Sequence, residues 1–230
     1  MNGVRVELGM AAKVVCISRT LAAGGEEIGQ AVAERLGFRV IDAEIIQWAA
    51  EKADVQPERV ARTEHRQSLI RRLISSIAFA EPSGVLAPEY YAVYPEAALA
   101  VGQTLEERLR LLIREVIEEV ATEGQAVIVA HAASMALSGR EGVLRVLVTA
   151  SDEERADRLV WAAGMERGAA EAAVRTSDGE RADYFRRFYE IDQELPTHYD
   201  LVINTDALAP EQVVNLIVAA ADAADKPSAE

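Results

Sequence analysis

The sequence of 230 residues is poor in cysteine, in aromatic residues and in positive charge. A single cysteine, Cys16, excludes an internal disulfide and fits a reducing compartment. The 38 acidic and 24 basic residues give a formal net charge of −14, which repels nucleic acids and anionic membrane surfaces. No apolar run approaches the roughly 20 residues that cross a bilayer, and the first dozen residues lack the apolar core of a secretory signal. We therefore expect a cytoplasmic protein that binds neither nucleic acid nor membranes.

The pattern of apolar residues predicts an α/β fold. Half of the residues are apolar, which is enough for one sizeable core. Short β-branched runs alternate with stretches of helical periodicity, as in parallel strands joined by crossover helices. The predicted strands are residues 14–17, 38–41, 126–130, 143–148 and 201–203. Such sheets bind ligands at the carboxyl ends of their strands, so the residues that follow each strand are the candidates for a site.

Residues 13–36 are predicted to form a strand, a loop of small residues and a helix, the unit in which α/β proteins bind phosphate with backbone N–H groups. The loop resembles a Walker A sequence without its lysine. If Gly24 is the last glycine of that pattern, Gly25 takes the lysine position; if Gly25 is that glycine, Glu26 takes it. Arg19 is the nearest cation and could bind phosphate oxygens instead. The alternative is an ordinary turn whose acidic residues favour the helix N-terminus and which binds no ligand.

Two further strand ends carry candidate ligands. Asp42 follows the second strand, where a helix N-cap is the alternative role, and His131 follows the third, where a hydrogen-bonded core histidine is the alternative. A basic stretch at residues 59–72 could meet an anionic substrate or pair with its own glutamates on a solvated helix. Residues 81–95, rich in proline and tyrosine, predict a loop or cover. The three histidines lack the spacing of metal ligands, so no metal site is expected.

Five segments, in order along the chain, resemble the cytidylate kinase-like family. They are residues 14–28, 37–42, 146–158, 178–184 and 198–208. The first resembles the family's opening Ser-Arg, glycine-rich loop and Glu-Ile, and the fourth its lid, where an Asp and an Arg three residues later recur. The resemblance implies a three-layer P-loop kinase-like fold, a parallel sheet flanked by helices with helical monophosphate-binding and lid insertions. It divides the chain into an extension at 1–12, an α/β domain at 13–220 with an insertion at about 55–123 and a lid at about 164–195, and an acidic tail at 221–230.

The resemblance also implies an activity: transfer of a phosphoryl group from ATP to a nucleoside monophosphate such as CMP, with Mg²⁺. The implied catalytic residues are Arg19, Asp178 and Arg181. The implied ATP-binding residues are Ser18, Arg19, Ala23, Gly24, Gly25, Glu26 and Glu27. The implied substrate-binding residues are Asp42, His131, Arg155 and Arg158. On a helix, however, Arg155 and Arg158 can instead pair with Asp152 or Glu154.

The chain departs from the family pattern at the phosphate loop. The family's Gly-Ser-Gly-Gly is Ala-Ala-Gly-Gly at residues 22–25, and its Gly-Arg after the third strand is Ala130-His131. Each change removes flexibility or positive charge from the site, and each lost charge-assisted contact costs about 1.5–3 kcal/mol. Two functions follow. The first, expected from the family, is a kinase that uses Arg19 in place of the lysine; the alternative is an inactive nucleotide sensor or scaffold that keeps the kinase fold.

Overall fold

The computed structural model describes residues 12–42, 45, 48, 49, 52, 105–129 and 132–223. The chain divides into two compact units, one of residues 1–43 and 117–230, the other of residues 44–116. In the second unit, the described residues are helical and include the first part of helix α5 (Leu105–Glu123). The predictions on His131, on the basic stretch 59–72 and on residues 81–95 lie outside the described residues.

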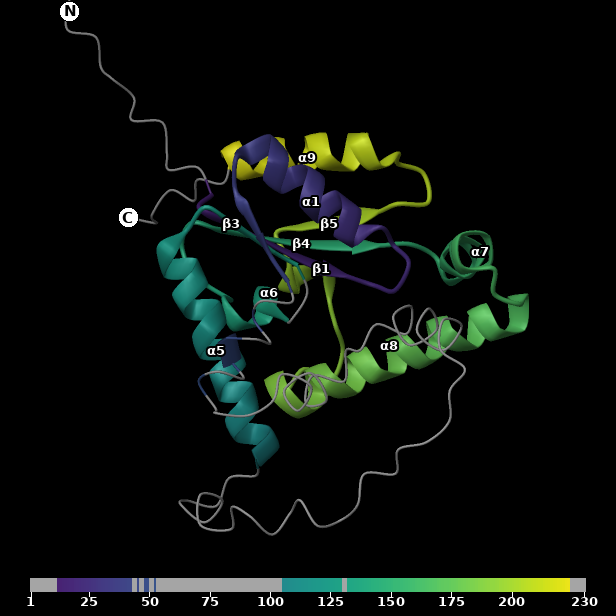
Figure 1. Ribbon diagram of the computed structural model, residues 1–230, viewed down its shortest axis with the longest axis horizontal. Helices are drawn as coiled ribbons and strands as arrows, with labels where there is room; N and C mark the ends of the chain where they lie inside the picture. Colours follow the sequence, from purple (N-terminus) through teal and green to yellow (C-terminus); the bar gives the residue numbers. More distant parts are fainter. Residues whose placement is uncertain are drawn as a thin grey trace, which may run out of the picture. The chain divides into compact units, whose positions relative to one another are not determined.

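The first unit is built on a parallel five-stranded sheet (Figure 1). Its order is β2 (Arg39–Ile41), β3 (Ala126–Val129), β1 (Val14–Arg19), β4 (Val143–Thr149) and β5 (Leu201–Asn204). The central strand β1 pairs along its length with β4 and over its first four residues with β3. Its apolar residues are buried because helices cover both faces of the sheet. The α/β class and all five predicted strands are thereby confirmed, with small shifts at their ends.

Helices α1 (Gly25–Leu36) and α9 (Pro210–Ala223) cover one face of the sheet, and the short helix α6 (Ala133–Ala136) lies on the other (Figure 1). The core between α1, α9 and the sheet contains Val15, Ile17, Ile28, Val32, Val129, Val146, Ile203, Val214 and Ile217. Helix α9 extends over the first three residues of the predicted tail, and its Ala221 belongs to this core. Among the described helices, none is both long and apolar enough to cross a bilayer.

Helices α7 (Asp152–Ala163) and α8 (Arg167–Tyr189) pack together: α7 lies beyond the carboxyl ends of the strands, and α8 runs from there back below the sheet (Figure 1). Ser151 begins α7 as its N-cap, where its side chain accepts a hydrogen bond from the N–H of Glu154. After α8 the chain returns through a 3-10 turn, η2 (Pro196–His198), to β5. The helix pair therefore stands beside the edge where ligands of parallel sheets bind.

Cys16 lies in the middle of β1 and is fully buried. Burial raises the pKa of its thiol to about 12, because the charged thiolate would lose its hydration. The thiol therefore stays neutral at physiological pH, and the interpretation of Cys16 as a core residue is confirmed.

Candidate functional site

The loop between β1 and α1 spans residues 20–24 and brings the first turn of α1 to the carboxyl end of β1. Gly24 is the N-cap of α1, with a φ of 80° that glycine adopts without strain. No described side chain caps this helix, so the N–H groups of its first turn are open to an anion. Ala22 also has a left-handed φ, of 60°, which costs a residue with a Cβ about 1–2 kcal/mol. Alanine thus occupies a loop position that suits glycine, as the departure from the family pattern predicts.

The Arg19 side chain fills the space that the first side-chain atoms of a Walker A lysine at residue 25 would occupy. Its stem packs against Gly25 so closely that a Cβ at residue 25 would lie 2.6 Å from the Cβ of Arg19. A lysine at residue 25 therefore does not fit while Arg19 keeps this conformation. The Arg19 guanidinium turns to the first turn of α1, where its Nη2 pairs with Glu26 Oε1 at 2.6 Å. Its buried Nε has no hydrogen-bond partner in the described part of the chain.

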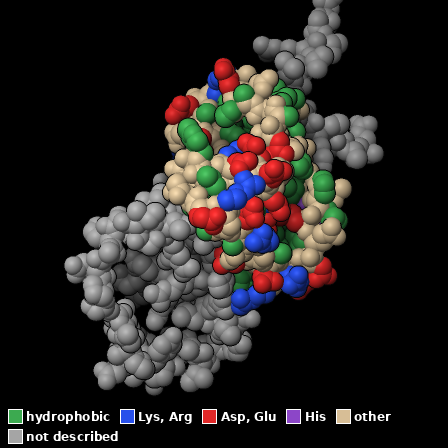
Figure 2. Space-filling view, turned by 90° about the vertical axis from the view of Figure 1, so that its right-hand side faces the viewer, with side chains coloured by type: hydrophobic (Ala, Val, Ile, Leu, Met, Phe, Trp, Pro, Cys, Tyr) green, Lys and Arg blue, Asp and Glu red, His purple; other side chains and the backbone are tan. Residues whose placement is uncertain are grey.

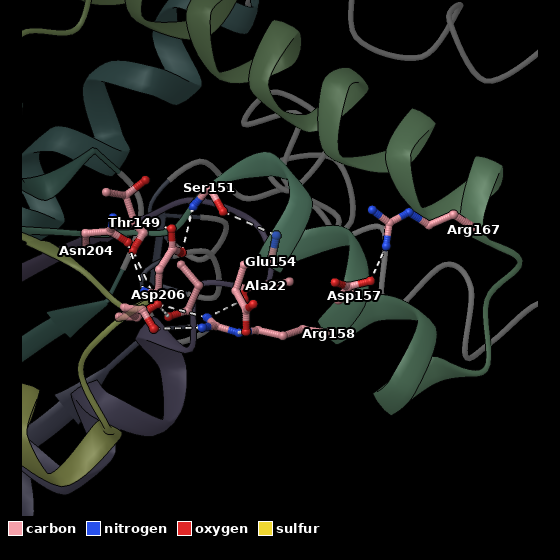
Figure 3. A network of polar contacts seen from close by, with 11 residues as sticks. Ala22, Thr149, Ser151, Glu154, Asp157, Arg158, Arg167, Asn204 and Asp206 are labelled. Carbon is pink, nitrogen blue, oxygen red and sulfur yellow. Dashed lines mark hydrogen bonds and ion pairs between the residues drawn. The ribbon is translucent and has the colours of Figure 1, made fainter.

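Arg158 on α7 also contacts the loop (Figure 3). Its Nη1 donates to the carbonyl of Ala22 at 3.2 Å and to Thr205 Oγ1 at 2.8 Å, and its Nη2 donates to the carbonyl of Thr205 at 2.8 Å. The Thr205 hydroxyl lies 3.2 Å from the carbonyl of Ala23 and donates to it. Arg158 Nε pairs with Glu154 at 3.2 Å. The N–H groups of Arg158 therefore fix the loop to the end of β5 and to α7.

Arg155 joins α7 to α8. Its side chain is 3% exposed and donates two hydrogen bonds to Asp178, of 2.9 and 2.5 Å, and one of 2.7 Å to Asp152. Burial alone would lower the pKa of Arg155, but the hydrogen bonds to Asp178 and Asp152 outweigh it and raise the pKa. The Arg155–Asp152 and Arg158–Glu154 pairs are those that helical spacing predicts; contact of either arginine with a ligand stays a prediction.

Arg181 on α8 reaches the carboxyl end of β1. Its Nη1 donates to the carbonyl of Arg19 at 3.1 Å, and its Nη2 lies 3.5 Å from Ser18 Oγ. Its Nε and Nη2 donate to the two carboxylate oxygens of Glu194 at 2.6 and 2.5 Å. The structure thus brings the predicted lid arginine to the loop, with its guanidinium already paired.

Near the loop, four guanidinium groups are therefore paired with five carboxylates of the same chain. Arg19 pairs with Glu26, Arg155 with Asp152 and Asp178, Arg158 with Glu154, and Arg181 with Glu194. On the side of α7 and the start of α8, acidic side chains likewise surround the basic ones (Figure 2). This network carries no surplus of positive charge for a ligand.

The other predicted residues are at the same edge of the sheet. Ser18 is buried at the end of β1, Ala23 is buried in the loop, and Glu27 is exposed on the first turn of α1. Asp42 directly follows β2, whose carboxyl end points to this edge, and is half-buried. Contact of any of these residues with a nucleotide stays a prediction.

Two residues of this network are absent from the sequence-based set: Glu194 and Tyr199. Thr205 lies two residues after the predicted last strand, residues 201–203, and so belongs to the strand-end residues that the sequence marks as candidates. Tyr199 lies in a segment that resembles the family, but nothing there indicates that its hydroxyl faces an arginine 18 residues earlier. Glu194 stands in a stretch without periodicity, between helix α8 and the turn η2.

Comparison with known proteins places the chain in a family. The sequence model of the cytidylate kinase-like family matches residues 14–207. The chain belongs to the cytidylate kinase-like family. No curated protein sequence matches it significantly.

Among solved structures, this family member is similar to an uncharacterized protein from Eubacterium ventriosum, with 14% identity, a TM-score of 0.62 and coverage of 91% of this chain and 98% of the other. It is more distantly similar to a gluconokinase from Sinorhizobium meliloti, with 12% identity, a TM-score of 0.48 and 90% coverage of both chains. A shikimate kinase from Bacteroides thetaiotaomicron is 16% identical, with a TM-score of 0.46 and coverage of 89% and 95%. The first of these likenesses supports the fold alone.

Proposed function

We propose that this family member binds the phosphate group of a nucleotide at the first turn of α1 and does not transfer it. The observation that carries the proposal is the pairing of the four guanidinium groups near the loop with five carboxylates of the chain itself. Phosphoryl transfer depends on positive charge placed around the transferring group, where negative charge develops in the transition state. A network with more carboxylates than guanidinium groups lacks the positive charge that transfer requires.

Binding itself is supported by the open first turn of α1 and by the position of Arg19. N–H groups at a helix N-terminus attract anions, and the Arg19 guanidinium stands beside them with a single ion-pair partner among the residues that the structure describes. That partner, Glu26, is 47% exposed and can turn into solvent when a phosphate arrives. A nucleotide is the ligand that membership of the family favours. Magnesium would take most of its ligands from the phosphate oxygens and from water, because the described residues hold no group of three or more potential side-chain ligands.

The competing function is the one that the family resemblance implies, transfer of a phosphoryl group from ATP to a nucleoside monophosphate. One observation favours it: the Arg19 side chain fills the space at Gly25 where a Walker lysine would stand. In that case Arg19 would have to leave Glu26 and stabilise the transferring phosphate.

Calorimetric titration with ATP and with CMP, each with and without Mg²⁺, tests the proposal together with a coupled assay of ADP release. We expect binding of at least one nucleotide and no ADP release for any ATP–monophosphate pair. ADP release above the background without protein would establish the kinase instead. Failure of both nucleotides to bind would contradict both functions.

The variant Arg19→Ala tests where the nucleotide binds. Loss of one charge-assisted contact of about 1.5–3 kcal/mol should weaken binding roughly 10- to 150-fold. The matched control is Arg35→Ala, which removes an exposed arginine from the last turn of the same helix. It should leave the affinity unchanged, since Arg35 contacts Asn215 and not the loop. Equal affinities in the two variants would place the ligand elsewhere.

A further inference from the structure

Arg181 is the point at which four separate parts of the chain meet. Its side chain is 9% exposed and extends from α8 to the carbonyl of Arg19, at the end of β1. Glu194 binds it through both carboxylate oxygens, and the Tyr199 hydroxyl accepts a hydrogen bond from its Nη2 at 3.2 Å. The guanidinium therefore connects α8, the segment after α8, the residue after η2 and the strand that leads into the loop.

The partners of Arg181 also bind each other. The Tyr199 hydroxyl donates to Glu194 Oε1, so that Arg181, Glu194 and Tyr199 form a closed triangle. The Phe185 ring lies 4.7 Å from the Arg181 guanidinium, in cation–π contact with it. Burial would lower the pKa of Arg181, but the hydrogen bonds to Glu194 outweigh it and raise the pKa. Burial raises the pKa of the Tyr199 hydroxyl. The guanidinium therefore stays charged, and the hydroxyl stays protonated and able to donate.

We infer that Arg181, Glu194 and Tyr199 are positioning residues, which fix the end of β1 so that the loop amides and the Arg19 guanidinium face the phosphate. This inference rests on the proposed function. Arg181 acts through the backbone of Arg19, the residue whose side chain meets the first turn of α1. The Glu194 carboxylate occupies both Nε and Nη2 of Arg181, so these donors serve the triangle and not a ligand. When Arg181 fixes the carboxyl end of β1, the loop that follows keeps a single conformation.

The variant Glu194→Gln tests the inference, because it keeps the shape of the side chain and removes its charge. A positioning role predicts an affinity for the nucleotide that falls on the order of tenfold, since the loop loses its fixed conformation. A phosphate-binding role for Arg181 predicts the opposite: the released guanidinium would raise the affinity. A higher or unchanged affinity would therefore overturn the inference. Tyr199→Phe, which removes a single hydroxyl group, should act in the same direction and more weakly.

The matched control is Asp200→Asn. Asp200 accepts two hydrogen bonds from the Arg145 side chain, of 3.0 and 2.8 Å, near the start of β4 and away from the loop. This variant breaks a comparable arginine–carboxylate pair one residue from Tyr199. Both Asp200→Asn and Glu194→Gln should lower the melting temperature, and Asp200→Asn should leave nucleotide affinity unchanged.

Amide hydrogen exchange of residues 18–27 gives a readout that needs no ligand. Exchange in this segment should be faster in Glu194→Gln and Tyr199→Phe than in the wild type, and unchanged in Asp200→Asn. Equal exchange in all four proteins would overturn the inference even if the affinities differ. If the wild type binds no nucleotide, the proposed function fails, and the exchange measurement still decides whether the triangle fixes the loop.

Discussion

Replacing Glu26 with glutamine should raise the affinity for a nucleotide phosphate. In the free protein the Glu26 carboxylate pairs with the Arg19 guanidinium at 2.6 Å, so a phosphate has to displace it. Glutamine keeps the length of the side chain and removes the charge that competes. One charge-assisted hydrogen bond is worth about 1.5 kcal/mol or more, so the affinity should rise about tenfold. The ion pair itself is partly exposed, so its loss should lower the free energy of unfolding by only about 0.2–1 kcal/mol.

The assay is calorimetric titration of CMP and ATP into the wild type, Glu26→Gln and Glu27→Gln. Glu27 is the neighbouring carboxylate in the same turn, and it forms no ion pair with another described residue. Both variants remove one negative charge from the first turn of α1, so they share the change in net charge and the weaker interaction with the helix dipole. Only Glu26→Gln releases Arg19. Equal affinities in the two variants would refute the idea that Glu26 competes with the ligand for this guanidinium.

The remaining predictions concern stability and reactivity. Ala22→Gly should raise the free energy of unfolding by up to about 1 kcal/mol, because the strain energy of the left-handed φ that is relieved exceeds the entropic cost of ordering a glycine. A lower free energy of unfolding, measured with denaturant, would contradict this. Gly29→Ala should lower the free energy of unfolding by about 1–3 kcal/mol, because the new Cβ would lie 2.6 Å from Val129 Cγ2. Gly179→Ala on α8, where the new Cβ has open space, should raise it by about 0.5–1 kcal/mol. Cys16 should resist alkylation at pH 8 until the protein unfolds. The pKa of the Cys16 thiol, about 12, lies above that of an unfolded thiol. The contribution of Cys16 to the free energy of unfolding is therefore complete below about pH 9 and falls by roughly 1.4 kcal/mol per pH unit above pH 9. The variant Cys16→Ala should reduce this slope in alkaline unfolding curves.

Local patterns were sufficient to predict the fold. The buried strand β1 and the amphipathic helix α1 are encoded by neighbouring residues, so the unit around the loop is predictable from periodicity alone. The pairing of Arg155 with Asp152 and of Arg158 with Glu154 is also local, because residues three and four apart share a helix face.

The pairing of the other guanidinium groups was beyond such patterns. Arg155 meets Asp178 across two helices, 23 residues along the chain. Arg181 meets Glu194 only because the chain turns back after α8. The contact of Arg19 with Glu26 depends on the missing Cβ of Gly25, which lets the arginine stem lie against α1. A sequence motif places an arginine near a phosphate site but does not show whether a phosphate or a carboxylate of the chain holds it.

The energies of these pairs separate Arg19, which a ligand can recruit, from Arg155 and Arg181, which it cannot. A phosphate that took Arg155 or Arg181 from its carboxylate would gain about 1.5–3 kcal/mol. It would leave Asp178 or Glu194 without its guanidinium, and breaking a buried pair costs about 3–5 kcal/mol. The exchange is therefore unfavourable for Arg181, where arginine and carboxylate are 9% and 21% exposed, and for Arg155, which is 3% exposed and would have to leave two carboxylates, Asp178 and Asp152. Glu26 is 47% exposed and regains its hydration when it leaves Arg19, so there the exchange is favourable. Of these three arginines, only Arg19 is thus left for the phosphate, which suits binding and falls short of what phosphoryl transfer requires.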